Sequence, residues 1–140
     1  MAGENIHELK TKQPDSEKIT INLGFVDLGN IDLLVQEGLY SNRTDLIRTA
    51  IRNQLDRHQE VIRRSVTRHD IDIGLRRYGA ADLEAARAAS QKLHIQVLGL
   101  VVIAPDVTPQ LARDTIESIK VLGSLQASPA VKAALQGRIH

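Results

Sequence analysis

Among the residue types that could bind a ligand or take part in catalysis, arginine is the most strongly clustered in this sequence. Nine arginines fall between residues 43 and 77, where only five acidic residues oppose them. The first 42 residues carry three lysines against seven acids, and the net charge of the whole chain is only +1. A local guanidinium cluster can bind phosphate groups, although a solvated helix face is the alternative. The cluster consists of Arg43, Arg48, Arg52, Arg57, Arg63, Arg64, Arg68, Arg76 and Arg77.

Residue types that serve catalysis or metal binding form no recognisable motif. The sequence lacks cysteine, a glycine-rich phosphate loop, a nucleophile elbow and a histidine pair at helical i, i+4 spacing. His58 and His69 are three helical turns apart, about 16 Å, which is too far for one metal ion. We therefore expect a protein that is not an enzyme, with no catalytic residues, no metal and no cofactor.

Two further places are candidates for ligand binding. Asp70 and Asp72 would share a strand face close to residues 76–78, which is either a ligand site or a solvated strand end. Residues 104–106 and Ser128 follow two expected strands, where parallel sheets often bind ligands. Neither place has distinctive chemistry.

The polar residues Lys18, Thr20 and Asn22 alternate with apolar residues, which is typical of a half-buried strand. A lone six-residue strand cannot satisfy its backbone or bury its apolar face. No neighbouring run can pair with it, so we expect it to pair with a second copy of the chain. The apolar face consists of Ile19, Ile21 and Leu23.

Two helices are expected after this strand. Asp27 is a plausible N-cap for the first, and Gly38 suits the left-handed residue that ends it. Asn42 and Asp45 form a short-acid variant of the capping box before the second helix. The apolar stripe of that helix contains Ile47, Ile51 and Leu55.

Together these features resemble a known family. The order of residues 19–23, the helix end at 37–40 and the opening Ser-Asn-Arg-Thr-Asp-Leu-Ile-Arg at 41–48 look like a ribbon-helix-helix DNA-binding domain of the Arc/MetJ/CopG type. The resemblance covers roughly residues 17–57. It implies an intertwined homodimer whose antiparallel two-stranded ribbon enters the DNA major groove.

The resemblance also implies a set of DNA-binding residues. Hydrogen bonds from the outward face of the ribbon would read base edges, and the start of the second helix would hold a phosphate through its N–H groups and its dipole. The expected base-reading residues are Lys18, Thr20 and Asn22. The expected phosphate-binding residues are Asn42, Arg43, Thr44 and Arg48.

The remainder of the chain contains a repeat. Ile95–Gly99 recurs 24 residues later as Ile119–Gly123, and Ile71 with Ile73 suggests a degenerate earlier copy at the same offset. Each unit reads as a strand followed by a short helix. Strands near 71–75, 94–103 and 118–125 would form a small parallel sheet or a very short solenoid.

We therefore predict an α+β protein with three parts. Residues 1–17 form a flexible arm, and residues 18–68 form the ribbon-helix-helix domain with a second helix that extends to about Arg68. Residues 69–140 form a small α/β domain of three strand–helix units that serves oligomerisation or an effector. No stretch approaches a membrane span, so we expect a cytoplasmic protein. The resemblance to ribbon-helix-helix regulators implies that it is bacterial.

The sequence favours a transcriptional regulator, a repressor, that binds a double-stranded inverted-repeat operator as a homodimer or homotetramer. One alternative is an antitoxin of a toxin–antitoxin pair. Another is a structural assembly protein built through the C-terminal repeats.

Overall fold

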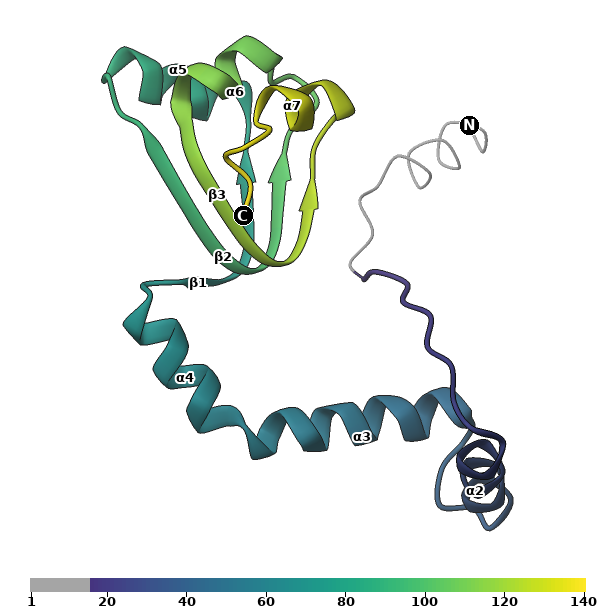
Figure 1. The fold of residues 1–140 in the computed structure, drawn as a ribbon. Helices are drawn as coiled ribbons and strands as arrows, with labels where there is room; N and C mark the ends of the chain where they lie inside the picture. The colour runs from purple at the N-terminus through teal and green to yellow at the C-terminus, as the bar shows by residue number, and fades with distance from the viewer. Residues whose placement is uncertain (1–15) are drawn as a thin grey trace, which may run out of the picture. The chain divides into compact units, whose positions relative to one another are not determined.

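The computed structural model describes residues 16–140, so the expected arm falls almost entirely outside the described residues. The chain forms two compact units that divide between Asp56 and Arg57 (Figure 1). The described part of the first unit contains α2 (Phe25–Gln36) and most of α3 (Arg43–Arg57). Helix α2 begins at Phe25 after Gly24, so Asp27 lies in its first turn and is not the expected N-cap.

The second unit begins beside a break in the helix. The prediction of one continuous helix from Arg43 to Arg68 was wrong, because α3 ends at Arg57 and α4 (Gln59–Arg68) begins after His58. His58 has φ −102° and ψ 13°, which lies outside the helical range. Any L-residue can adopt these angles, so neither glycine nor proline is needed to mark the break.

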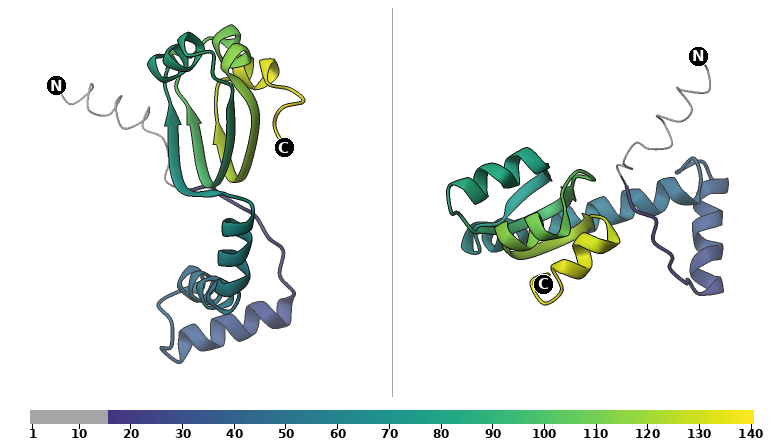
Figure 2. Two further views of the ribbon diagram at one scale, coloured as in Figure 1. Left: turned by 90° about the vertical axis from the view of Figure 1, so that its left-hand side faces the viewer. Right: turned by 90° about the horizontal axis from the view of Figure 1, so that it is seen from above.

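Three strands alternate with three helices in the rest of the second unit. The order is β1 (Asp72–Tyr78), α5 (Ala80–Ala88), β2 (Leu93–Ile103), α6 (Pro109–Thr115), β3 (Ile116–Gln126) and α7 (Pro129–Ala134). The strands pair in parallel in the order β1-β2-β3. Figures 1 and 2 place the three helices next to one another at one end of the strands. This mixture of helix and strand fits the expected α+β class.

The strands do not run straight through the sheet. Figure 1 shows β2 and β3 bending back near their middles. Gly74, Gly99 and Gly123 are register partners at this level, with φ of 118°, 140° and 130°. A Cβ on Gly99 would overlap the carbonyl oxygen of Gly74, and one on Gly123 would overlap that of Gly99. Only glycine fits positions that combine a positive φ with such close backbone contact.

The core lies on the inner side of the bent strands. Val97 and Val101 flank the bend in β2 and are 1% and 0% exposed. The helices cover this side with Leu83 from α5, Leu111 from α6 and Val131 from α7, all buried in the same cluster. Because the core contains aliphatic side chains and no tryptophan or phenylalanine, it depends on close packing of branched residues. The buried cluster is completed by Ile95, Ile103, Val107, Ala112, Ile116, Ile119 and Leu135.

The repeat holds between β2 and β3 but shifts by one residue in β1. Ile95 pairs with Ile119 and Val97 with Val121, as the 24-residue offset requires. In β1, however, Ile73 pairs with Leu98 and not with Val97, so the expected equivalence was wrong. A shift of one residue turns a side chain to the opposite face of a sheet. Ile73 is consequently 62% exposed.

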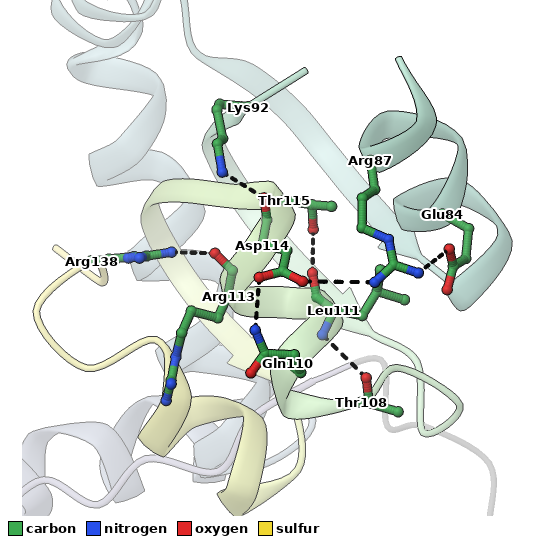
Figure 3. A network of polar contacts seen from close by, with 10 residues as sticks. All are labelled: Glu84, Arg87, Lys92, Thr108, Gln110, Leu111, Arg113, Asp114, Thr115 and Arg138. Atoms are coloured by element: carbon green, nitrogen blue, oxygen red, sulfur yellow. Dashed lines mark hydrogen bonds and ion pairs between the residues drawn. The ribbon is translucent and has the colours of Figure 1, made fainter. Parts of the chain in front are cut away.

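Helix α6 is held at both ends by polar groups (Figure 3). At its start the Thr108 hydroxyl accepts a hydrogen bond from the Leu111 N–H at 3.1 Å. At its end Lys92 Nζ donates to the Asp114 carbonyl at 2.7 Å, and Arg138 donates to the Arg113 carbonyl at 2.6 Å. These cations satisfy carbonyl groups that a helix end leaves without partners.

Candidate nucleic-acid interface

The segment before α2 presents two uncovered faces. Lys18, Thr20 and Asn22 are exposed, and residues 18–23 form no strand in the single chain. Ile19 is 73% exposed and Ile21 57% exposed, although aliphatic side chains of this size are usually buried. The ribbon needs a second chain, so its formation and the base-reading role of the three polar residues stay predictions.

The turn between α2 and α3 is fixed by backbone and side-chain hydrogen bonds. Gly38 has φ 83°, as expected for the left-handed residue that ends a helix, and the Leu39 N–H donates to the Leu34 carbonyl at 3.0 Å. Asn42 Oδ1 accepts from the Asp45 N–H at 2.8 Å, and Asp45 Oδ2 accepts from the Ser41 N–H at 2.9 Å. Asn42 thus caps α3, while the reciprocal bond lies one residue earlier than a capping box would place it.

Arg43 does not point away from the protein as a free cation. Its guanidinium donates from Nε to Asp32 Oδ1 at 2.7 Å and from Nη2 to Asp32 Oδ2 at 2.8 Å. The hydrogen bonds from Arg43 lower the pKa of the Asp32 carboxyl below its ordinary value. This two-bond geometry links α2 to α3. The side chain of Arg43 is therefore engaged within the chain, which the sequence did not indicate.

The start of α3 adjoins a shallow polar hollow of about 420 Å³. Three of the expected DNA-binding residues line it, namely Asn42, Thr44 and Arg48. Arg52 is a lining residue that the sequence analysis did not select, although its spacing was a usable signal. Thr44, Arg48 and Arg52 follow one another at intervals of four and therefore lie along one helix face. The remaining lining residues are Ser41, Asp45 and Thr49.

Two kinds of anion-binding group are available at this hollow. Arg48 and Arg52 make no ion pair with any residue between 16 and 140. The backbone N–H groups of Arg43 and Thr44 likewise have no hydrogen-bond partner within that range. Unpaired N–H groups at a helix start attract phosphate, and the helix dipole adds to this attraction.

The other candidate sites have structural explanations. Asp72 forms an ion pair with Arg76, with 3.7 Å between Oδ2 and Nε. Asp106 Oδ1 accepts a hydrogen bond from the Ala80 N–H at 3.1 Å, and Ser128 caps α7 through the Val131 N–H. Across the described part of the chain, no group of three metal-ligating side chains occurs and no helix is long and apolar enough to span a membrane.

Comparison with known proteins gives one match. The model of the Ribbon-Helix-Helix transcriptional regulator family matches residues 14–132, which extends well beyond the resemblance noted in residues 17–57. No match was found among curated proteins or among solved structures. The family match includes the strand segment, the α2–α3 turn and most of the bent-strand unit. The chain therefore belongs to the ribbon-helix-helix transcriptional regulator family.

Proposed function

We propose that this protein is a sequence-specific, double-stranded DNA-binding repressor that acts as a homodimer. Residues 18–23 of two chains pair into an antiparallel ribbon that enters the major groove. Lys18, Thr20 and Asn22 on its outer face hydrogen-bond to base edges, where each base pair presents a distinct pattern of donors and acceptors. The operator is an inverted repeat, because a two-fold symmetric reader matches two-fold symmetric DNA.

The uncovered apolar face of this segment is the observation that carries the proposal. Ile19, Ile21 and Leu23 are 73%, 57% and 40% exposed immediately before a two-helix unit. Pairing with a second copy would place these side chains against the helices and leave the polar face outside. Exposed apolar residues in the two-helix unit support the same arrangement, with Leu33 on α2 at 52% and Leu39 in the turn before α3 at 65%.

We assign the phosphate contacts to the start of α3. The Arg43 and Thr44 N–H groups and the side chains of Asn42, Thr44 and Arg48 hold the DNA backbone, and Arg52 extends the contact along the helix. Arg43 contributes through its main chain, since Asp32 engages its guanidinium. Such contacts position the protein without reading sequence.

The folded second unit favours this function over that of an antitoxin. Antitoxin tails in this family tend to be disordered until a toxin binds them, whereas residues 72–134 form regular strands and helices around a buried core. The proposal includes no reaction, in keeping with a family of regulators that are typically not enzymes.

Selection of duplexes from a random library, with the wild-type protein, tests the proposal. We expect an inverted repeat to be enriched. Asn22→Ala should lower affinity for the selected site by about 1–3 kcal/mol per lost base contact and relax sequence preference at the contacted position. Lys18→Ala and Thr20→Ala should act similarly at other positions. Enrichment of no sequence, or unchanged preference in all three variants, would exclude the ribbon as the reading element.

A further inference from the structure

The outer edge of β1 is an unpaired strand edge. The sheet order makes β1 a terminal strand, and no segment between residues 16 and 140 pairs with its outer side. The opposite edge is treated differently. There the Ile119 N–H donates to the Arg138 carbonyl and the His140 N–H donates to the Ile119 carbonyl, both at 2.8 Å. Open strand edges are templates for pairing with another strand.

At two positions of β1, a charged residue stands where the neighbouring strand β2 has a buried core residue. Asp72 occupies the position of Val97 in the neighbouring strand, and Arg76 occupies that of Val101. The two valines are buried on the inner side of the bend, whereas Asp72 and Arg76 form an ion pair there. Inward-facing charges oppose pairing with an ordinary apolar strand. These charges favour pairing only with a strand that carries complementary charges at the same positions.

We propose that β1 pairs antiparallel with β1 of a second copy, with Gly74 opposite Gly74. In this register Asp72 of each chain lies opposite Arg76 of the other, so four charges form two additional pairs across the edge. Ile73 lies opposite Leu75, which joins side chains that are 62% and 56% exposed in the single chain. The two sheets become one six-stranded stack.

The bend selects this register over its neighbours. The existing stack places glycine on glycine at each step, because the strands can approach closely only where their bends coincide. Gly74 opposite Gly74 is the antiparallel register that keeps the two bends together. Parallel pairing at the same level would set Asp72 against Asp72 and Arg76 against Arg76, and like charges placed directly opposite are destabilising.

This contact is separate from the ribbon and adds a second place where copies meet. If the ribbon forms, it holds two second units at a raised local concentration, or the edge joins one ribbon dimer to another. In both cases the same residues of β1 come together. The contact requires neither DNA nor the polar face of residues 18–23, so its failure and the failure of DNA recognition are distinguishable.

Cross-linking of single-cysteine variants of the full chain tests the proposal, since the natural chain has no cysteine. In the proposed register, residues 73 of the two copies are diagonal neighbours about 7–8 Å apart. Ile73→Cys should give a covalent dimer with a short bis-maleimide. Leu122→Cys is the matched control, because it occupies the same outward position on β3 and is 49% exposed.

We expect Ile73→Cys to cross-link at least tenfold faster than Leu122→Cys, while both react equally with a monofunctional maleimide. Equal cross-linking rates, or no dimer from Ile73→Cys, would overturn the proposal. Full-length chains that remain folded by circular dichroism are used throughout.

Charge reversal identifies the partner residues. Added to Ile73→Cys, either Asp72→Arg or Arg76→Asp should reduce cross-linking several-fold, because each places like charges across the edge. Co-expression of the two charge-reversed chains should restore it, with the mixed dimer as the main product. The ion pair within each chain is absent from both variants, so restoration can come only from pairing between chains. Failure to restore cross-linking would exclude the assigned register.

Discussion

The guanidinium of Arg43 donates two parallel hydrogen bonds, of 2.7 and 2.8 Å, to the carboxylate of Asp32. These bonds join the start of α3 to the middle of α2. Both side chains are about half exposed, at 53% and 51%, so the pair remains accessible to water and salt. Its main effect is geometric, because a planar guanidinium held by two bonds fixes the direction of the helix that carries it. The same helix start presents the unpaired N–H groups proposed to hold DNA.

Removing either partner of this pair should therefore have the same consequence. We predict that Asp32→Ala and Arg43→Ala weaken binding to specific and random DNA by similar factors, since each releases the α3 start. Equilibrium binding at several salt concentrations provides the measurement. A flatter salt dependence for Arg43→Ala alone would instead indicate that its guanidinium contacts phosphate.

Acid should also weaken this link. The pKa of Asp32 is depressed below its ordinary value of 3.8 by the hydrogen bonds from Arg43. The stability that this carboxylate contributes is present above pH 3.8 and is lost as the pH falls through the depressed pKa. We predict that lowering the pH below 3.8 reduces the helical circular dichroism of Asp32→Asn less than that of the wild type. Each protein is compared with its own signal at neutral pH.

Arg48 and Arg52 should contribute charge without reading sequence. We predict that each change to alanine reduces the magnitude of the slope of log affinity against log salt by roughly one phosphate contact and lowers affinity for all sequences alike. Arg63→Ala is the control, because Arg63 is an exposed arginine on α4 that pairs with Glu60. Equal slopes for all three variants and the wild type would exclude phosphate contacts by the Arg48 and Arg52 side chains.

The strand segment allows a matched test of dimerisation. We predict that Ile21→Asp abolishes the dimer, because the carboxylate would be buried against helices at a penalty of several kcal/mol. Thr20→Asp places the same charge on the neighbouring, outward face and should leave the dimer intact. Light scattering gives the mass of each variant in chains that also carry Asp72→Arg, which weakens the proposed β1 contact. A folded Ile21→Asp dimer in that background would contradict the ribbon.

The glycines at the strand bends should not tolerate a methyl group. We predict that Gly99→Ala and Gly123→Ala destabilise the second unit, since each adds a positive-φ penalty of about 1–3 kcal/mol to an overlap with a backbone carbonyl. Gly29→Ala is the control. It lies inside α2 with nothing within 4 Å of the new Cβ, and should stabilise the helix by up to about 1 kcal/mol. Thermal unfolding compares the three variants.

Parts of this molecule could be predicted because they depend on local patterns. The Gly38 turn, the Asn42 cap and the 24-residue offset between β2 and β3 each follow from residue type and spacing. The break at His58 could not, since no special residue marks it. Nor could the pairing of Arg43 with Asp32, which depends on how two helices meet across a turn. The one-residue offset of β1 could not be predicted either. Isoleucine at position 73 is typical of a core residue, but the strand register alone decides whether its side chain is buried.

The alignment of the glycines limits how the number of residues between neighbouring strands can vary. Gly74 and Gly99 are 25 residues apart, whereas Gly99 and Gly123 are 24 apart, yet both steps place glycine on glycine. The offset is constant across the paired residues of β1 and β2, so the extra residue lies between Tyr78 and Val97, in the segment that contains α5. Insertions and deletions among relatives should collect there. A single residue gained within a strand, between its glycine and either end, would shift one arm of that strand out of step with its neighbours.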